Sequence, residues 1–469
     1  MEKFKKGIKK LVKNIKGCFM MASKMFNKSY QKLLLSLGLL VLVFALSACG
    51  GSSDNNDDNN TNNEDSGEVS GEIEVWGWNV AAASMDLAAE SFMEENPGTT
   101  IKVRDIGDTD LYERMTVGMG AGGSGLPDLS IMHTDELRGY LEQFPDQFTD
   151  LSELGFDEHV DKFVDFKAEA ITTDDGTVVA MPWDIGPSGV FYRVDLFEEA
   201  DVNPDDIETW DDYIEAGKQI KEVTGVDMLP VEITASDRIY RMLINQLGAS
   251  YFTEDDEVNI ASEDSQRALE VIKKMYDSDI VANANDWDAM SGLVANGNVA
   301  TIPLGVWYSG TIMDQATDLE GKWDAFWLPA FDEGGNRAAN NGGSDLMIPS
   351  SSENPELAYA FAEYFVTNVD AQVEALSEYG LFPSLTEAYD DPFFDEPVPY
   401  FNDSPVFNMF AEIAENVEPS VYSGDFARAQ DVIVDAQSAI LLDGKDVSKV
   451  LDEVADRLKN ETGKSRSDK

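Results

Sequence analysis

The chain has 469 residues, and its 34 lysines and arginines stand against 89 aspartates and glutamates, which gives a formal net charge of −55. A surface this acidic repels phosphate backbones and anionic lipid headgroups, so nucleic-acid binding through a basic face is excluded. With 43% hydrophobic and 10% aromatic residues, the chain is too apolar to be disordered throughout. Its length suggests about two or three domains.

The charge is unevenly distributed along the chain. Residues 1–49 hold ten lysines and one glutamate, so the residues after Cys49 carry 24 basic and 88 acidic side chains, a net charge of −64. Within the basic start, residues 33–46 (LLLSLGLLVLVFAL) contain no charge. Fourteen residues are typical of a signal-peptide core and are short for a membrane span, which needs about 20. We therefore predict an export signal over residues 1–49.

The motif that ends this signal is LSACG at residues 46–50. It resembles the bacterial lipobox, in which the cysteine is lipidated and becomes the first mature residue. The resemblance implies lipidation at Cys49 and anchoring on the extracellular face of the cell membrane; a transmembrane anchor with a chance cysteine is the alternative. The translation start stays open among four methionines: Met1, Met20, Met21 and Met25.

Residues 50–71 form an acidic, low-complexity stretch that cannot bury apolar area, so we predict a disordered tether. The other cysteine, Cys18, lies in the segment that the signal would remove. No thiol is left in the body of the protein, which excludes disulfides and cysteine metal sites there. We predict no metal site and no cofactor.

The body that follows is predicted to alternate strands and helices. Strands are expected at residues 72–79, 100–104, 129–132, 299–304 and 323–328, and helices at 82–95, 110–119, 355–366 and most of 407–459. This alternation is typical of an α/β fold with parallel strands. The glycine-rich residues 118–125 contain a G-x-G-x-x-G pattern, but a helix precedes it and a strand follows. A dinucleotide site needs the reverse order, so we interpret the segment as a flexible connection.

An enzyme is poorly supported by the sequence. The body contains two histidines, His133 and His159, and no G-x-S-x-G elbow. Two histidines are also too few for a multi-histidine zinc site. A pair of carboxylates for glycoside hydrolysis stays open, because so many acids make close pairs inevitable.

Several segments resemble, in order, the family 1 bacterial extracellular solute-binding proteins, the maltose- and multiple-sugar-binding group of ABC importers. The segments are LPDL (126–129), DGTVVAMPW (175–183), GVFYRVDLF (189–197), TWDD (209–212), NGNVA (296–300), GVW (305–307), GGS (342–344) and SENPELA (352–358). The resemblance spans about residues 72–461. It departs from the family pattern at Arg193-Val194, where the family usually has Asn-Lys, and at residues 380–383, where a bulky residue is inserted between Gly and Pro.

The resemblance implies a two-lobed periplasmic-binding-protein-like α/β fold, with ligand in a cleft between lobes joined by hinge crossings. Lobe 1 would hold residues 72–183 and 330–380, and lobe 2 would hold residues 184–329 and 381–461. Residues 462–469 are expected to be a flexible tail. The function implied is capture of a carbohydrate, expected to be an oligosaccharide, by a monomeric lipoprotein that delivers it to the permease subunits of an importer.

The candidate ligand residues combine flat aromatic rings with polar neighbours, which suits the apolar faces and hydroxyl rims of sugars. Trp78-Asn79 and Trp183-Asp184 supply such pairs, and Trp307-Tyr308 offers stacking from the other lobe. Family positions favour ligand contact for these three tryptophans and for Asp135 and Glu136. Asp237, Arg238 and Trp287 are further candidates, with a surface or packing role as the alternative, and Gly343-Ser344 would offer a backbone N–H and a hydroxyl. Packing in the core is the alternative for each tryptophan. A cationic or zwitterionic ligand, such as a polyamine or betaine, and a tethered glycosidase are the alternative functions.

The charge of −64 on the exported part generates a prediction about solution conditions. Such a surface repels itself unless salt screens it, with a Debye length of about 8 Å at physiological ionic strength and about 3 Å at 1 M. We expect the melting temperature to rise as sodium chloride is added, consistent with a saline or alkaline habitat. A flat or falling curve in a thermal denaturation series would contradict this expectation.

Overall fold

The computed structural model describes residues 69–173 and 175–467. The predicted export signal, the lipidation site Cys49 and residues 50–68 of the predicted tether lie outside the described residues. The strands are β1 (Gly71–Gly77), β2 (Thr99–Asp105), β3 (Leu129–His133), β4 (Met181–Arg193), β5 (Leu229–Val231), β6 (Val281–Asn283), β7 (Thr301–Gly305), β8 (Trp323–Trp327), β9 (Asn340–Met347) and β10 (Phe382–Pro383).

The helices confirm the predicted alternation. They are α2 (Asn79–Glu95), α3 (Asp108–Gly120), α4 (Thr134–Gln143), α5 (Asp165–Ala170), α6 (Val194–Glu199), α7 (Trp210–Thr224), α8 (Arg238–Gln246), α9 (Glu263–Asp277), α10 (Trp287–Ala295), α11 (Tyr308–Gln315), α12 (Pro355–Thr367), α13 (Val369–Tyr379), α14 (Val406–Ala414), α15 (Phe426–Leu441) and α16 (Val447–Thr462).

Local chemistry sets the start of α7, at residues 209–212. The Thr209 side chain accepts a hydrogen bond from the backbone N–H of Asp212, and the Asp212 carboxylate accepts from the backbone of Thr209. This reciprocal capping box satisfies two N–H groups that the first turn leaves free. At the other end Gly225 adopts φ 77°, a left-handed conformation that glycine allows at no steric cost and that ends the helix.

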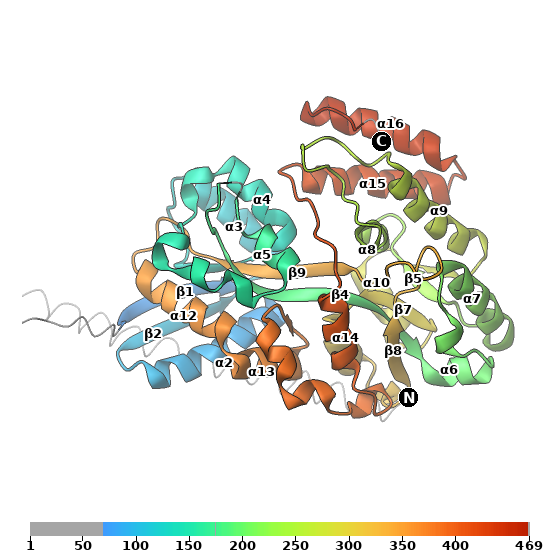
Figure 1. Cartoon of the computed structure of the whole chain (residues 1–469), viewed down its shortest axis with the longest axis horizontal. Helices are drawn as coiled ribbons and strands as arrows, with labels where there is room; N and C mark the ends of the chain where they lie inside the picture. The colour runs from blue at the N-terminus through green and yellow to red at the C-terminus, as the bar shows by residue number, and fades with distance from the viewer. Residues whose placement is uncertain (1–68, 174, 468–469) are drawn as a thin grey trace, which may run out of the picture. The chain divides into compact units, whose positions relative to one another are not determined.

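The main sheet runs in the order β10-β4-β9-β3-β1-β2. Strands β1, β2 and β3 are parallel, as expected from the alternation of strands and helices, whereas β9 pairs antiparallel with β3 and β4. In Figure 1, α2, α12 and α13 lie on one side of this sheet, and α3, α4 and α5 lie on the other.

Strand β4 belongs to two parts of the molecule at once. Its first half, up to Pro187, pairs with β9 and β10, and its second half, from Ser188, pairs with β7 and β8. All thirteen of its residues are buried. The strand is therefore one of the crossings that join the two lobes, and Figure 1 shows it, with β9, running from the sheet of the first lobe into the second.

Three buried apolar clusters lie along these crossings. The first core draws on residues 73–183 and 346–385. The second core contains Val190 and Tyr192 of β4 together with α7, α8, α9, α15 and α16, and the third contains Phe191 with β7 and α14. Because successive side chains of a strand point to opposite faces, the second half of β4 supplies both clusters.

Two predicted segments behave differently in the structure. Phe331 and Ala339, which the prediction placed in lobe 1, pack in or against the second core. The described part of the tail that was expected to be flexible, residues 463–467, is instead fastened to residues 256–258. There the N–H of Val258 donates to the carbonyl of Ser465 at 2.8 Å, and Lys464 forms an ion pair with Asp256. This correction has an electrostatic cause, since the tail brings two basic residues to a strongly acidic surface.

Candidate functional site

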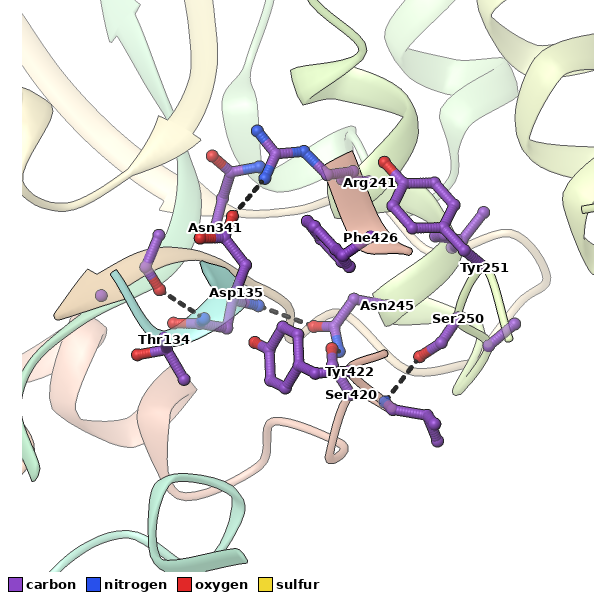
Figure 2. Close-up of a pocket in the computed structure, with 16 residues that line it drawn as sticks. Thr134, Asp135, Arg241, Asn245, Ser250, Tyr251, Asn341, Ser420, Tyr422 and Phe426 are labelled. Carbon is purple, nitrogen blue, oxygen red and sulfur yellow. Dashed lines mark hydrogen bonds and ion pairs between the residues drawn. The ribbon is translucent and has the colours of Figure 1, made fainter. Parts of the chain in front are cut away.

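A pocket lies where the two lobes meet the crossing strand β9. It encloses about 490 Å³ of space outside the protein atoms, partly open to solvent. Its walls come from the start of α4, from α8 and the loop after it, from β9, and from the segment leading into α15 (Figure 2). The lining residues are Thr134, Asp135, Arg241, Ile244, Asn245, Ala249, Ser250, Tyr251, Asn340, Asn341, Gly342, Gly343, Ser420, Val421, Tyr422 and Phe426.

The polar groups of the lobe 1 wall are placed by the end of β3. This strand stops at His133, and α4 begins at the next residue, so Asp135 and Glu136 fall in the first turn of the helix. Carboxylates are favoured there because the helix dipole is positive at its N-terminus. Burial and the neighbouring Asp135 raise the pKa of Glu136 to about 7.

One ion pair crosses the pocket from lobe to lobe. Nη1 of Arg241 on α8 lies 3.1 Å from Oδ2 of Asp135, and its Nε lies 3.1 Å from Oδ1 of Asp237 (Figure 2 draws the first contact). Tyr251 donates its hydroxyl hydrogen to the other oxygen of Asp237. Burial lowers the pKa of Arg241, but Asp237, Tyr251 and Asp135 more than offset this, so the pKa is raised and the guanidinium stays charged.

A second set of charges is buried beneath the pocket. The Lys167 side chain is 1% exposed, and its Nζ lies 2.9 Å from both Oδ1 of Asp345 and the carbonyl oxygen of Ser344. It also donates to the hydroxyl of Thr134. Asp184 accepts a hydrogen bond of 2.6 Å from the N–H of Ser344. This network fixes the start of α4 against both crossing strands.

The lobe 2 aromatic residues form a stacked column next to the pocket. The rings of Trp287 and Trp307 are 5.8 Å apart at 29°, and the guanidinium of Arg238 lies 5.2 Å from the centre of Trp287. Nε1 of Trp307 donates to the carbonyl of Asn341, a residue that lines the pocket. Glu232 forms an ion pair with Arg238 on its other side.

Glycines make room for Trp307 against the crossing strands. A Cβ at Gly305 would lie 2.5 Å from Nε1 of Trp307, and a Cβ at Gly186 would lie 3.0 Å from the same atom. The first distance is shorter than real Cβ atoms show, and the second is tighter than most real Cβ contacts. The indole can therefore lie flat against β4 and β7 because these positions carry no side chain.

Lobe 1 carries its own aromatic group outside the pocket lining. Trp78 lies 4.4 Å from His133 and 6.1 Å from Tyr112, between ring centres. Asn79 starts α2 with φ 45°, and its N–H donates to Asp105 at 2.8 Å. Neither Trp78 nor Asn79 lines the pocket in this structure.

Of the thirteen ligand residues that the sequence nominates, Asp135 and Gly343 line the pocket. Trp183 is a correction: it is 1% exposed and packs on Phe365 in the first core, so no face of its ring is open to a ligand. Tyr308 is also 1% exposed, in the third core. The others surround the pocket without lining it: Asp184, Asp237 and Ser344 are buried in polar networks, and Glu136, Arg238, Trp287 and Trp307 are half-buried.

The sequence missed most of the lining. Arg241, Asn245 and Tyr251 were not nominated, nor were Tyr422 and Phe426, which the segment before α15 brings to the pocket. A signal existed for Arg241, because it lies one turn after Arg238 on the same helix. Helical spacing alone could not decide which of the two arginines lines the pocket.

In the part of the chain that the structure describes, no group of three or more His, Cys, Asp or Glu side chains is placed so that it could hold a metal ion. A helix long and apolar enough to cross a membrane is likewise absent from residues 69–173 and 175–467.

Comparison with known proteins decides the family. The model of the bacterial extracellular solute-binding proteins matches residues 77–372, more than half of the chain. The chain belongs to this family. The resemblance found in the sequence segments is thereby confirmed, as is the two-lobed α/β fold that it implied.

Relatives of this solute-binding protein are named for the sugars they bind. The lactose-binding protein of Rhizobium radiobacter is 30% identical over 397 residues, which cover 83% of this chain and 92% of that protein. The arabinooligosaccharide-binding protein of Bacillus subtilis is 26% identical over 408 residues, which cover 83% and 93%. The family and these relatives are binding proteins, not enzymes.

Solved structures share the fold. The crystal structure of an extracellular solute-binding protein of family 1 aligns with a TM-score of 0.71 at 25% identity, covering 83% of this chain and 99% of that one. A binding protein associated with an ABC transporter of B. animalis subsp. lactis Bl-04, in complex with β-1,6-galactobiose, aligns with a TM-score of 0.70 at 22% identity, covering 85% and 100%.

The buried carboxyl of Asp184 generates a prediction for this solute-binding protein. Burial raises its pKa to about 6, although Lys167 and Ser344 oppose the shift. The folded state thus binds this proton more tightly than the unfolded chain, where the pKa is about 3.9. The resulting stability is present below about pH 4 and is lost as the pH rises through about 6.

We therefore expect Asp184→Asn, which keeps an acceptor for Ser344 but cannot ionise, to gain stability relative to the natural protein between pH 4 and 7. One pKa unit corresponds to about 1.4 kcal/mol, so the gain should be on the order of 1–3 kcal/mol. Urea denaturation at several pH values measures it. Asp443→Asn, an exposed carboxylate, is the control; parallel pH curves for Asp184→Asn and the natural protein would contradict the account.

Proposed function

We propose that this protein is the ligand-capturing component of an ABC importer and that it binds a carbohydrate, of oligosaccharide length, in the pocket between its lobes. The observation that carries the proposal is the composition of the pocket. Hydroxyls and amides line it together with the half-buried ring of Tyr422, and the nearly buried rings of Tyr251 and Phe426 complete the wall. Such a mixture suits the apolar faces and hydroxyl rims of sugars.

The surroundings of the pocket also suit a saccharide. The column of Arg238, Trp287 and Trp307 lies beside it through Asn341. These rings would extend the binding surface for further sugar units once the lobes move apart. The sugar-binding names of the relatives point in the same direction.

Closure of the lobes supplies the mechanism. Because the walls come from both lobes, a ligand makes all of its contacts only when the lobes are together. Binding therefore shifts the population toward the closed form. The permease subunits would distinguish the closed shape from the open one. Lipidation at Cys49 would keep the protein close to the importer on the extracellular face of the membrane, as a monomer.

We expect isothermal titration calorimetry with a panel of neutral oligosaccharides, lactose and arabinooligosaccharides among them, to find a ligand with micromolar affinity or better. The affinity for a neutral sugar should change little with salt, because exposed charges do not contribute to binding. If no oligosaccharide of the panel gives a heat of binding, the carbohydrate assignment is wrong. Binding of a polyamine or betaine, with an affinity that falls steeply as salt is added, would support the alternative of a cationic or zwitterionic ligand instead.

Trp307→Ala should weaken binding of the ligand found in this way by about 1–3 kcal/mol, if the ring stacks on a sugar unit. Trp307→Phe retains a flat ring and serves as the matched control, with a smaller loss expected. Titration calorimetry gives the affinities, and circular dichroism verifies that the variants are folded. An unchanged affinity for Trp307→Ala in a folded protein would assign the ring to the core instead.

A further inference from the structure

The pocket holds two opposite charges that neutralise each other. Among the described residues that line it, Asp135 is the acidic one and Arg241 the basic one, and they form the ion pair that crosses the pocket. Their side chains are 24% and 20% exposed, so both still border the space where a ligand would lie. The remaining lining residues carry no charge.

Arg241 forms ion pairs with carboxylates of both lobes. The carboxylate of Asp135 in lobe 1 accepts a hydrogen bond from Nη1. The carboxylate of Asp237 in lobe 2, which is 2% exposed, forms an ion pair with Nε. An arginine recognises a carboxylate best when it can present a pair of N–H groups in its planar fork. With a carboxylate already on each side, the positive charge of this guanidinium is neutralised before an anionic ligand arrives.

The other cationic side chains near the pocket also have carboxylate partners. Lys167 is 1% exposed and its ammonium is held by Asp345, Thr134 and the carbonyl of Ser344. Arg238 is held by Glu232 and covered on one face by Trp287. Asp184 and Glu136 lie around the same space, where burial raises their pKa values to about 6 and about 7, so each adds negative charge only in part near neutral pH. A ligand carboxylate would thus meet cations that already have carboxylate partners.

We propose that Asp135 is a specificity-determining residue that, by holding Arg241, restricts the pocket to uncharged saccharides and rejects uronates. The inference rests on the proposed function of this pocket as a saccharide site. It goes beyond that function because it names the ligand's charge class and the side chain that sets it.

Asp135→Asn changes the charge with little change of shape. The amide oxygen can still accept from Nη1 of Arg241, while Asp237 and Tyr251 continue to hold the arginine on its own lobe. The guanidinium then carries one fewer neutralising carboxylate. A uronate can take the vacated role, since hydrogen bonds between charged groups are stronger than those between neutral groups.

The experiment compares D-glucose with D-glucuronate, two probes that differ in a carboxylate, at constant sodium concentration. Affinities are taken from calorimetry and from the ligand dependence of the melting temperature. Glu142→Gln is the matched control. It removes one negative charge from the same helix at a residue outside the pocket lining, where Glu142 accepts from the N–H of Gly424. The double variant Asp135→Asn/Arg241→Gln tests whether any gain depends on the arginine.

For Asp135→Asn we expect the affinity for glucuronate relative to glucose to rise about tenfold or more, which corresponds to about 1.4 kcal/mol. The natural protein and Glu142→Gln should show no such preference, and the double variant should lose it. An equal response of Asp135→Asn and Glu142→Gln to glucuronate overturns the inference, as does uronate binding by the natural protein. A gain that survives in the double variant also overturns it.

These outcomes are separable from the test of the proposed function. If the natural protein binds no neutral saccharide but Asp135→Asn gains glucuronate through Arg241, the carbohydrate assignment fails while the role of Asp135 stands. If a neutral oligosaccharide binds and Asp135→Asn gains nothing, the assignment stands and the specificity role fails.

Discussion

Strand β4 imposes the constraint on which the rest of the structure depends. A single extended segment of thirteen buried residues has to pair with β9 and β10 at one end and with β7 and β8 at the other. Its side chains enter all three apolar clusters: Met181 lies in the first, Val190 in the second and Phe191 in the third. Neither lobe can form its core without the strand that it shares with the other.

This sharing explains why polar chemistry collects at the crossings. Buried N–H, C=O and charged groups require partners, and strands that leave one sheet for another interrupt the regular ladder that supplies them. The register of β4 against β9 is irregular between Pro182 and Asp184 and between Ile185 and Pro187. Lys167, Asp184 and Asp345 meet at these irregularities, and the N–H of Gly186 is satisfied by the Asn340 side chain. The pocket lies directly against this polar region.

The sequence predicted what depends on neighbours along the chain. The alternating strand β1 and the helix α12 follow from local spacing, and each lies within a few residues of its predicted position. The length of β4 and its partners could not be read in this way, because Asp184 and Ser344 are 160 residues apart. Family resemblance, rather than periodicity, supplied the two lobes and their crossings.

The same limit applies to the site. Asp135, which the family resemblance nominates just after a strand end, lines the pocket. Trp183 was nominated because it stands at the crossing in sequence, but the strand's alternation turns its ring toward Phe365 and the first core. Arg241 and Tyr422 reach the pocket through packing of α8 and of the segment before α15, and no short pattern marks them.

The net charge of the chain and the charge of its pocket are governed by different physical effects. The acidic surplus lies mostly on exposed side chains, where water and salt screen it and where it governs repulsion between molecules. Around the pocket, desolvation makes an unpaired charge costly, so Lys167, Arg238 and Arg241 each have at least one carboxylate partner. A ligand entering this space meets groups whose charges are already matched, with hydroxyls, amides and aromatic rings left to recognise it. A protein with so large a surface charge can therefore present a binding site that selects for uncharged molecules.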